Sequence, residues 1–238
     1  MKNQTVFKRY EIKYLITKQQ KNEITEMMHE YMEDDEYGKS TLCNIYFDSD
    51  DYLLIRRSIE KPIYKEKLRI RSYGLASLES KAYVEMKKKY KSVVYKRRIA
   101  MKEADAMHYV CNKITPQNNT QITHELNYFL SLYENLAPKV FLSYEREAFY
   151  AKNDENFRIT FDENILWRDY DFSLCAGIYG DSILPEEKVL MEIKTVGAIP
   201  LWLTDILTKN KIYKTSFSKY ANAYKQLITK QKEYQYNV

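Results

Sequence analysis

Hydrophobic and charged residues alternate with a period of two along several short stretches of this chain. In residues 64–73, Lys65, Lys67, Arg69 and Arg71 occupy one parity and mostly apolar side chains occupy the other. Because successive side chains of a β-strand point to opposite faces, this pattern predicts a strand with one charged and one apolar face. The same alternation recurs at residues 9–14, 83–89, 157–162 and 191–194.

The chain as a whole predicts about eight strands, with helical segments between and after them. Residues 17–20 have the spacing of a capping box, which predicts a helix that begins there and ends before Gly38. Helical spacing returns between residues 103 and 136, after Pro200 and from Ser218. The predicted strands cover residues 7–16, 41–47, 63–73, 82–89, 93–101, 140–150, 157–161 and 189–196. Strand–helix–strand alternation is absent from this order, which favours an α+β fold built on an antiparallel sheet.

Length and composition limit the kind of protein that the chain can form. With 238 residues, of which 45% are apolar and 30% charged, the chain suits one domain over residues 1–238. Three scattered cysteines without C-x-x-C spacing disfavour a disulfide framework or a zinc site. The N-terminus lacks the apolar run of a signal peptide, and no stretch approaches the roughly 20 apolar residues that cross a bilayer. We therefore expect a soluble cytoplasmic protein without membrane insertion.

The charged parity of the predicted strands suggests a site for an anion. An ordinary sheet would expose that parity to water, and the alternation alone leaves this interpretation open. Within these strands, however, Glu-x-Lys flanked by apolar residues recurs at residues 11–13, 85–87 and 192–194. If the sheet closes with this parity inward, like charges about 5 Å apart repel by roughly 3 kcal/mol at an effective dielectric near 20. Such a basic tunnel requires a polyanion such as a phosphate chain, and its carboxylates suit a divalent metal.

These stretches, taken in order, resemble the VTC domain, the polyphosphate-polymerase module of the triphosphate tunnel metalloenzyme superfamily. The matching residues span nearly the whole chain, at 7–14 (FKRYEIKY), 45–48 (IYFD) with Tyr52, 67–73 (KLRIRSY), 84–87 (VEMK), 143–146 (SYER), 158–162 (RITFD), 191–194 (MEIK) and 217–220 (FSKY). The resemblance implies a closed antiparallel β-barrel of about eight strands, which forms a tunnel with a basic lumen and is flanked by helices. It also implies ATP as phosphoryl donor, polyphosphate as product, and Mn²⁺ or Mg²⁺ as cofactor.

The resemblance assigns roles to individual residues. It implies that the phosphates are bound by six cationic catalytic residues, Lys13, Arg69, Arg71, Lys87, Arg146 and Lys219. It also implies substrate contacts for Tyr144 and Ser218, and it places Glu192 at the metal-binding position. Further substrate-binding candidates are Lys96, Arg98, Arg158 and Lys194. Which parity faces inward in the strand of residues 95–99 stays open. Arginine forks suit these roles because a planar guanidinium binds two phosphate oxygens at once.

The same residues also have structural interpretations. The cations could form salt bridges within the sheet, Glu192 could pair with Lys194 or Lys87, and Ser218 could cap the last helix. We expect Glu11 and Glu85 to hold lysines in place rather than to bind metal. Lys88 has the opposite parity from Lys87 and is expected to point outward.

ATP-dependent polyphosphate synthesis is the first functional hypothesis, and three alternatives stay open. The same tunnel could hydrolyse triphosphates, bind polyphosphate without catalysis, or act as an adenylate cyclase. The chain contains neither a Walker A motif nor G-x-G-x-x-G, which excludes P-loop and Rossmann nucleotide sites. We expect ATP and polyphosphate as ligands and no nucleic acid. A membrane-protein partner and the oligomeric state are left open.

Overall fold

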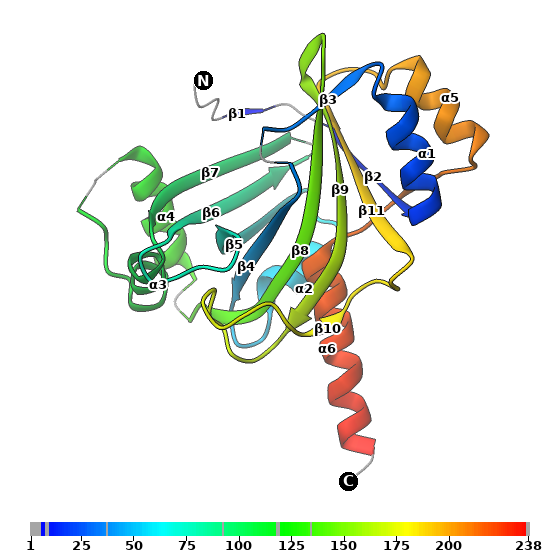
Figure 1. The fold of residues 1–238 in the computed structure, drawn as a ribbon. Coiled ribbons are helices and arrows are strands. Elements are labelled where there is room, and N and C mark those ends of the chain that lie inside the picture. The colour runs from blue at the N-terminus through cyan, green and yellow to red at the C-terminus, as the bar shows by residue number, and fades with distance from the viewer. Residues whose placement is uncertain are drawn as a thin grey trace.

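Strands from the whole length of the chain form one antiparallel sheet in the computed structural model, which describes residues 6–7, 10–36, 38–91, 93–117, 120–133 and 135–236 (Figure 1). The main path of the sheet runs β1-β7-β6-β5-β4-β8-β9-β11-β2-β12, while β3 pairs with β8 and β10 with β9. The strands are β1 (Val6–Phe7), β2 (Tyr10–Thr17), β3 (Met32–Asp34), β4 (Ser40–Asp48), β5 (Tyr64–Tyr73), β6 (Lys81–Tyr90), β7 (Val93–Lys102), β8 (Ala137–Ala151), β9 (Asp154–Arg168), β10 (Asp181–Ser182), β11 (Lys188–Thr195) and β12 (Lys214–Thr215). The helices are α1 (Lys18–Met28), α2 (Leu53–Ile59), α3 (Glu103–Asn112), α4 (Gln121–Leu132), α5 (Leu201–Lys209) and α6 (Lys219–Tyr236).

The two ends of the sheet path do not pair with each other in the described residues. β1 pairs only with β7 and β12 only with β2, so the predicted closed barrel is not confirmed. Both end strands contain two residues, which leaves few backbone groups to complete a ladder. β1 ends at Phe7 and β2 begins at Tyr10, so one short segment of chain reaches both halves of the sheet. Arg9, predicted on the charged parity of this segment, lies outside the described residues.

The sheet is strongly curved, so that the half with β5, β6 and β7 faces the half with β11 and β2 (Figure 1). An ion pair of 2.9 Å between Lys87 and Glu11 joins β6 to β2, although β5, β4, β8, β9 and β11 lie between them in the sheet. The concave side therefore carries the charged parity of these strands, and the convex side carries the apolar parity.

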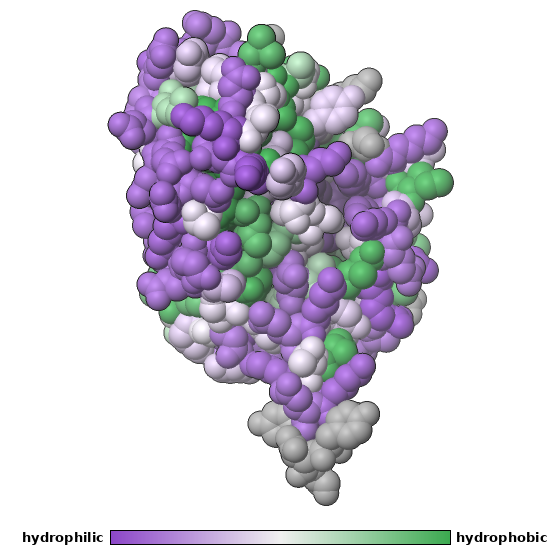
Figure 2. Space-filling view, turned by 90° about the vertical axis from the view of Figure 1, so that its right-hand side faces the viewer, coloured by the Kyte–Doolittle hydropathy of each residue, from purple (hydrophilic) through white to green (hydrophobic). Residues whose placement is uncertain are grey.

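Helices pack on the convex side of both halves. α3 and α4 cover β5 and β6, where Leu68, Ile70, Val84 and Met86 are fully buried. α1 and α5 cover β2, β9 and β11 through a second apolar cluster. Full burial of such a side chain contributes roughly 1.5–3 kcal/mol, so these layers fix which parity faces outward. Figure 2 views the molecule from the side of α1 and α5 and shows mostly hydrophilic side chains, with apolar ones between them.

One end of the concave side is filled by α6 and α2. The ring of Tyr220 stacks on Tyr46 with centroids 4.7 Å apart, and its hydroxyl donates a hydrogen bond of 2.9 Å to Asp48. Asp48 also accepts hydrogen bonds from the N–H groups of Leu54 and Ile55, at 2.8 and 3.0 Å. The Asp48 carboxylate thus anchors both helices against β4, which leaves the charged side chains at the other end of the concave side.

Most predicted elements are present, with changed bounds. Thr17 and Gln20 form the predicted capping box, but the helix ends at Met28 instead of continuing toward Gly38. The chain beyond it forms β3, which pairs with β8, so sheet pairing replaces helical hydrogen bonds there. α2 was not predicted, because seven residues are too few for a helical period to stand out. Among the described helices, none is both long enough and apolar enough to cross a membrane.

Candidate active site

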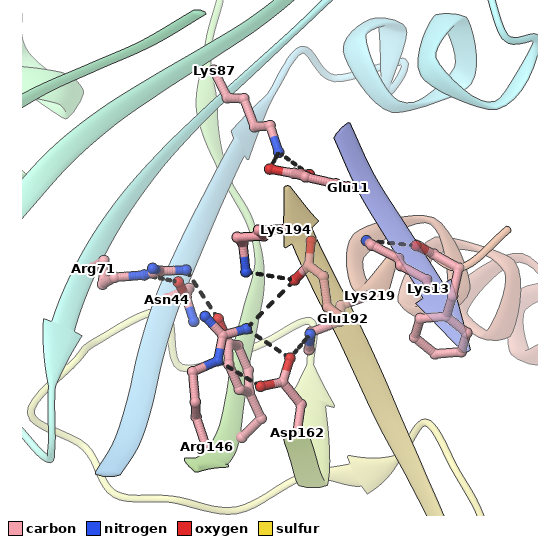
Figure 3. A network of polar contacts seen from close by, with 12 residues as sticks. Glu11, Lys13, Asn44, Arg71, Lys87, Arg146, Asp162, Glu192, Lys194 and Lys219 are labelled. Atoms are coloured by element: carbon pink, nitrogen blue, oxygen red, sulfur yellow. Dashed lines mark hydrogen bonds and ion pairs between the residues drawn. The ribbon is translucent and has the colours of Figure 1, made fainter. Parts of the chain in front are cut away.

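Charged side chains from both halves of the sheet and from the start of α6 gather on the concave side (Figure 3). All the predicted site residues lie on this side. They are Lys13 of β2, Arg69 and Arg71 of β5, Lys87 of β6, Lys96 and Arg98 of β7, Tyr144 and Arg146 of β8, Arg158 of β9, Glu192 and Lys194 of β11, and Ser218 and Lys219 at the start of α6. The curved sheet thus brings together residues that are spread over the sequence.

Glu85 is the centre of the charged cluster on β5, β6 and β7. Its side chain is 2% exposed and accepts two hydrogen bonds from Arg69, at 2.9 and 2.8 Å. Nζ of Lys96 lies 2.7 Å from Oε1 of Glu85. Nε of Arg71 lies 3.8 Å from Oε2, and Nη1 of Arg98 lies 3.9 Å from Oε1. Burial acts to raise the pKa of Glu85, but Arg71, Arg69 and Lys96 hold it well below its usual value. One ionised carboxylate therefore faces several cations, and positive charge remains for a ligand.

The orientation of β7, which the sequence left open, follows from the contacts on its two faces. Lys96 and Arg98 contact Glu85 on the concave side. Arg97 points to the convex side, where its Nε donates a hydrogen bond of 2.8 Å to Glu125 of α4. Lys96 and Arg98 therefore belong to the cluster, and Arg97 does not.

Arg71 is oriented by neutral polar groups in addition to Glu85. Its Nε donates to Asn44 Oδ1 at 2.8 Å, and its Nη2 donates to the Tyr144 hydroxyl at 3.0 Å. Burial acts to raise the pKa of Tyr144, but Arg71, Arg146 and Lys219 outweigh it and lower this pKa to about 8. Asn44 was not among the predicted residues. Its position two residues before Tyr46, on the concave parity of β4, is the signal that could have identified it.

Asp162 links β8, β9 and α6 at one point. It is fully buried and accepts hydrogen bonds from Nε and Nη2 of Arg146, at 2.6 and 2.7 Å. Lys219 forms an ion pair with the same carboxylate. Burial acts to raise the pKa of Asp162, but Arg146 and Lys219 lower it below its usual value. The sequence placed Asp162 on the charged parity without a role, and the structure shows that it fixes two predicted phosphate-binding residues.

Glu192 has one carboxylate oxygen engaged and one available. Nζ of Lys194 and Nη2 of Arg146 lie 3.3 and 3.9 Å from Oε2, whereas Oε1 has no hydrogen bond or ion pair with a described residue. Burial acts to raise the pKa of Glu192, but Lys194, Lys13 and Arg146 hold it well below its usual value. In the part of the chain that the structure describes, no group of three or more His, Cys, Asp or Glu side chains could hold a metal ion. The described carboxylates alone therefore do not complete a metal site, and a divalent cation would also need oxygens from a ligand.

Two lysines connect the halves of the sheet to each other and to α6. Lys87 donates to both oxygens of Glu11, at 3.1 and 2.9 Å, which shows Glu11 holding a lysine in place as expected. Lys13 donates a hydrogen bond of 2.8 Å to the carbonyl of Phe217 (Figure 3). Ser218 accepts a hydrogen bond of 3.3 Å from an N–H group in the first turn of α6, which confirms that it caps this helix.

Arg158 and Lys194 lie beside each other where β9 pairs with β11. Arg158 donates a hydrogen bond of 3.0 Å to Asp35, so its charge is partly balanced by the protein. Burial lowers the pKa of Lys194 to about 8, although Glu192 opposes the shift. This part of the cluster therefore offers less uncompensated charge than the part around Glu85.

Two cavities of about 500 and 540 Å³ lie against α3 and α4, away from the charged cluster. The larger one is lined by residues of β7, α3 and the loop after α3, including Tyr109 and Ile114. Both cavities are lined by polar and apolar residues together, and neither brings several cations to one point as the concave side does. The charged concave surface is therefore the stronger candidate for a phosphate site.

Comparisons with known proteins agree with the fold. The family model of the VTC domain matches residues 8–228. A proposed adenylate cyclase from Bacillus halodurans has a similar structure, with a TM-score of 0.57 at 16% sequence identity over 90% of this chain and 96% of that one. A proposed adenylyl cyclase from Hippeastrum, described as having a dominant triphosphatase activity, gives a TM-score of 0.49 at 13% identity over 89% and 94% of the two chains. No curated protein matches the sequence.

Proposed function

Because the chain belongs to the VTC domain family, we propose that it transfers the terminal phosphate of ATP to a growing polyphosphate chain, with the help of a divalent metal ion. The observation that carries this proposal is the gathering of cations from both halves of the sheet on one concave surface. The carboxylates on that surface are too few to neutralise them. A ligand with several phosphates would supply the missing negative charge.

Phosphoryl transfer requires a protein mainly to position the phosphates and to stabilise their charge. Arg69 and Arg146 are each held by a buried carboxylate, and Arg71 is held by Asn44 and Tyr144. Their guanidinium forks are therefore oriented before a ligand arrives, which is the arrangement that gives electrostatic stabilisation at the lowest reorganisation cost. Lys87 and Lys219 would add point charges beside these forks.

In the proposed reaction, a terminal oxygen of the polyphosphate chain forms a bond to the γ-phosphorus of ATP. The bond from that phosphorus to the β–γ bridging oxygen breaks, and ADP leaves with the electron pair. The chain becomes one phosphate longer, so atoms and charges balance without a protein nucleophile. The residues of the cluster bind and orient the two phosphate groups that react.

The residues present fit a divalent metal ion. Glu192 is ionised and has Oε1 available. Glu192 would hold the ion, with phosphate oxygens as further ligands. When bound, the ion would neutralise charge on the phosphate oxygens.

Incubation of the purified protein with ATP and Mn²⁺ or Mg²⁺ tests this proposal. We expect an acid-labile polymer that lengthens with time, together with one ADP for each phosphate added. Glu192→Gln should lower the rate on the order of 100-fold, because it removes the charged metal ligand. Arg97→Ala removes a cation from the convex face of β7 and should leave the rate within about twofold.

Three outcomes would contradict the proposal. Orthophosphate without polymer would favour triphosphate hydrolysis, and cyclic AMP would favour a cyclase. Tight polyphosphate binding without turnover, unchanged in Glu192→Gln, would favour a binding module.

A further inference from the structure

Exposed apolar side chains gather where β5 begins and β6 ends. Tyr64 and Tyr90 lie directly opposite each other in the register of these two strands, and both rings are exposed. Ile63 precedes β5 and is 67% exposed, and its carbonyl accepts a hydrogen bond of 2.7 Å from the N–H group of Lys91. The chain that enters β5 and the chain that leaves β6 therefore lie side by side at this end of the sheet.

The end of α4 continues this surface. The hydroxyl groups of Tyr64 and Tyr133 both donate hydrogen bonds to the carboxylate of Glu66, the second at 2.9 Å. Leu132, the last residue of α4, comes just before Tyr133 and is 55% exposed. Tyr128 is exposed four residues earlier, and residues four apart share one face of a helix. We call the large exposed side chains of this surface the apolar patch, namely Ile63, Tyr64, Tyr90, Tyr128 and Leu132.

Cations surround the apolar patch. Residues 60–66 and 88–91 contain five lysines and two glutamates, which gives a net charge of +3 in eleven residues, compared with +5 for the whole chain. Lys61 and Lys91 are exposed to solvent. One of the two glutamates is Glu66, which is buried, and Nζ of Lys88 lies 3.8 Å from its Oε1. This surface is therefore basic as well as apolar.

We propose that the apolar patch and its lysines bind the surface of a bilayer that contains anionic phospholipids. This peripheral contact goes beyond phosphoryl transfer and does not depend on it. Peripheral proteins bind more tightly as they bury more apolar area among the lipids and as basic side chains approach anionic headgroups. Tyrosines suit this interface because their rings are apolar and their hydroxyl groups polar. Ile63 and Leu132 would enter between the headgroups, and Lys61 and Lys91 would contact the lipid phosphates.

A single-stranded nucleic acid also binds surfaces that combine cations with aromatic rings, because its bases stack on the rings. The aliphatic members of the patch distinguish the two ligands. Ile63 is the most exposed side chain of the patch, and Leu132 is more than half exposed. An aliphatic side chain offers no ring to a base, whereas it loses contact with water when it enters a bilayer. The composition of the patch therefore favours lipid.

Flotation of the whole protein with vesicles tests this contact. One set of vesicles contains phosphatidylcholine alone, and the other contains phosphatidylcholine mixed with phosphatidylglycerol. We expect binding to the mixed vesicles only, and we expect it to weaken as the salt concentration rises. Lys61→Met/Lys91→Met should lower the affinity about tenfold or more, because each lysine near an anionic surface adds to the attraction.

Cations of the concave side also attract anionic vesicles, so the decisive variant changes apolar side chains and keeps every charge. Ile63→Ser/Tyr90→Ser should lower the affinity for the mixed vesicles about tenfold or more. The matched control is Leu201→Ser/Tyr213→Ser, which replaces side chains that are 80% and 78% exposed on the half of the sheet with β2. This control should leave the affinity within about twofold of the wild type.

A tryptophan in the patch reports insertion directly. The fluorescence of Ile63→Trp should shift to shorter wavelength when mixed vesicles are added, because the indole leaves water. The fluorescence of Leu201→Trp should not shift. Urea unfolding checks that each variant is folded, and Ile63→Ser alone repeats the comparison if the double variant is not.

Three results would overturn the proposed contact. The first is a wild-type protein that does not bind the mixed vesicles. The second is equal affinity of Ile63→Ser/Tyr90→Ser and its control, which would assign the attraction to the concave cations. The third is an unstructured RNA, or polyglutamate as a model of an acidic protein, whose binding the same variant weakens more than it weakens vesicle binding. That result would assign the patch to a nucleic acid or to a protein partner.

Discussion

The concave side holds positive charge in two different ways. In the arginine region, defined by Arg69, Arg71 and Arg146, two guanidinium groups are fixed by the buried carboxylates of Glu85 and Asp162 at 2.6 to 2.9 Å. In a second region, the lysine track, defined by Lys65, Lys67 and Lys89, the observed partners are a carbonyl and a hydroxyl. The first region is oriented by the protein itself, which suits phosphates that must react in one geometry. The second attracts negative charge without fixing it, which suits a chain that must move.

The largest effect should come from removing a carboxylate of the arginine region. Asp162→Asn leaves Arg146 and Lys219 without their shared partner and should lower the free energy of unfolding by about 3–5 kcal/mol at pH 7. Urea unfolding measures this, with Glu79→Gln as the control. Its pair with Lys102 is exposed to solvent, so its loss should change the stability little. Equal stability of Asp162→Asn and the wild type would show that this carboxylate does not hold the region together.

The same variant predicts a pH dependence. The pKa of Asp162 is lowered in the folded protein, so its contribution is complete above its unfolded pKa of about 4 and is lost as the pH falls below that value. The difference in stability between the wild type and Asp162→Asn should therefore be largest near neutral pH and should shrink in acid. Urea unfolding at pH 7 and pH 3 gives the comparison, and a difference that grows in acid would contradict the assignment.

Exchanging arginine and lysine should separate the two regions by activity. Arg69→Lys keeps a charge beside Glu85 but loses the planar fork, and should lower polymer synthesis by roughly 10- to 100-fold. Lys65→Arg in the track should change the rate by less than about threefold, because a mobile chain needs charge rather than one geometry. Initial rates of ADP release measure both variants. Equal losses would mean that the track also requires a fixed geometry.

The affinity of the track for polyphosphate should depend on pH near neutrality, because its lysines can lose their charge there and arginines cannot. Lys67 has a pKa of about 7 in the unbound protein, and a bound anion favours its charged form, so binding takes up a proton. Affinity for long-chain polyphosphate should therefore fall by several-fold as the pH rises from 7 to 9. Lys96, Lys194 and Tyr144, with pKa values of about 8, titrate in the same range. Lys67→Arg isolates the contribution of Lys67 because it keeps these three side chains, and it should weaken the dependence measured by titration calorimetry.

The smallest effect should be the change in protein stability when lysines of the track are replaced. Lys65→Met/Lys67→Met removes two charges that face other lysines, so the free energy of unfolding should stay within about 1 kcal/mol of the wild type or rise slightly. Denaturation in urea without polyphosphate gives this value. A loss of several kcal/mol would show that these lysines hold the fold, as the carboxylates of the arginine region do.

Much of the candidate site could be predicted because a strand has a fixed period. The alternation of Lys65, Lys67, Arg69 and Arg71 with mostly apolar residues placed their side chains on one face, and the structure puts that face on the concave side. The parity of β7 could not be predicted, since Lys96, Arg97 and Arg98 follow one another and only Glu85 and α4 distinguish their two faces. Asn44 and the role of Asp162 were missed because the role of a buried polar residue depends on its hydrogen-bond partner on another strand.

The sequence by itself determined which side chains share a face of each strand, where α1 and α6 begin, and the family to which the chain belongs. Only the tertiary structure decided which charged faces meet and how the sheet ends, since its two ends do not pair in the described residues and the predicted closed barrel is not confirmed. Glu11 binds Lys87 across 76 residues, and Lys67 reaches Ser218 across 151 residues. The physical reason is that a period of two is a local property of the backbone. Which distant strands come together is instead a property of the packed molecule, in which apolar layers lie against the convex side and α6 lies at one end of the concave side.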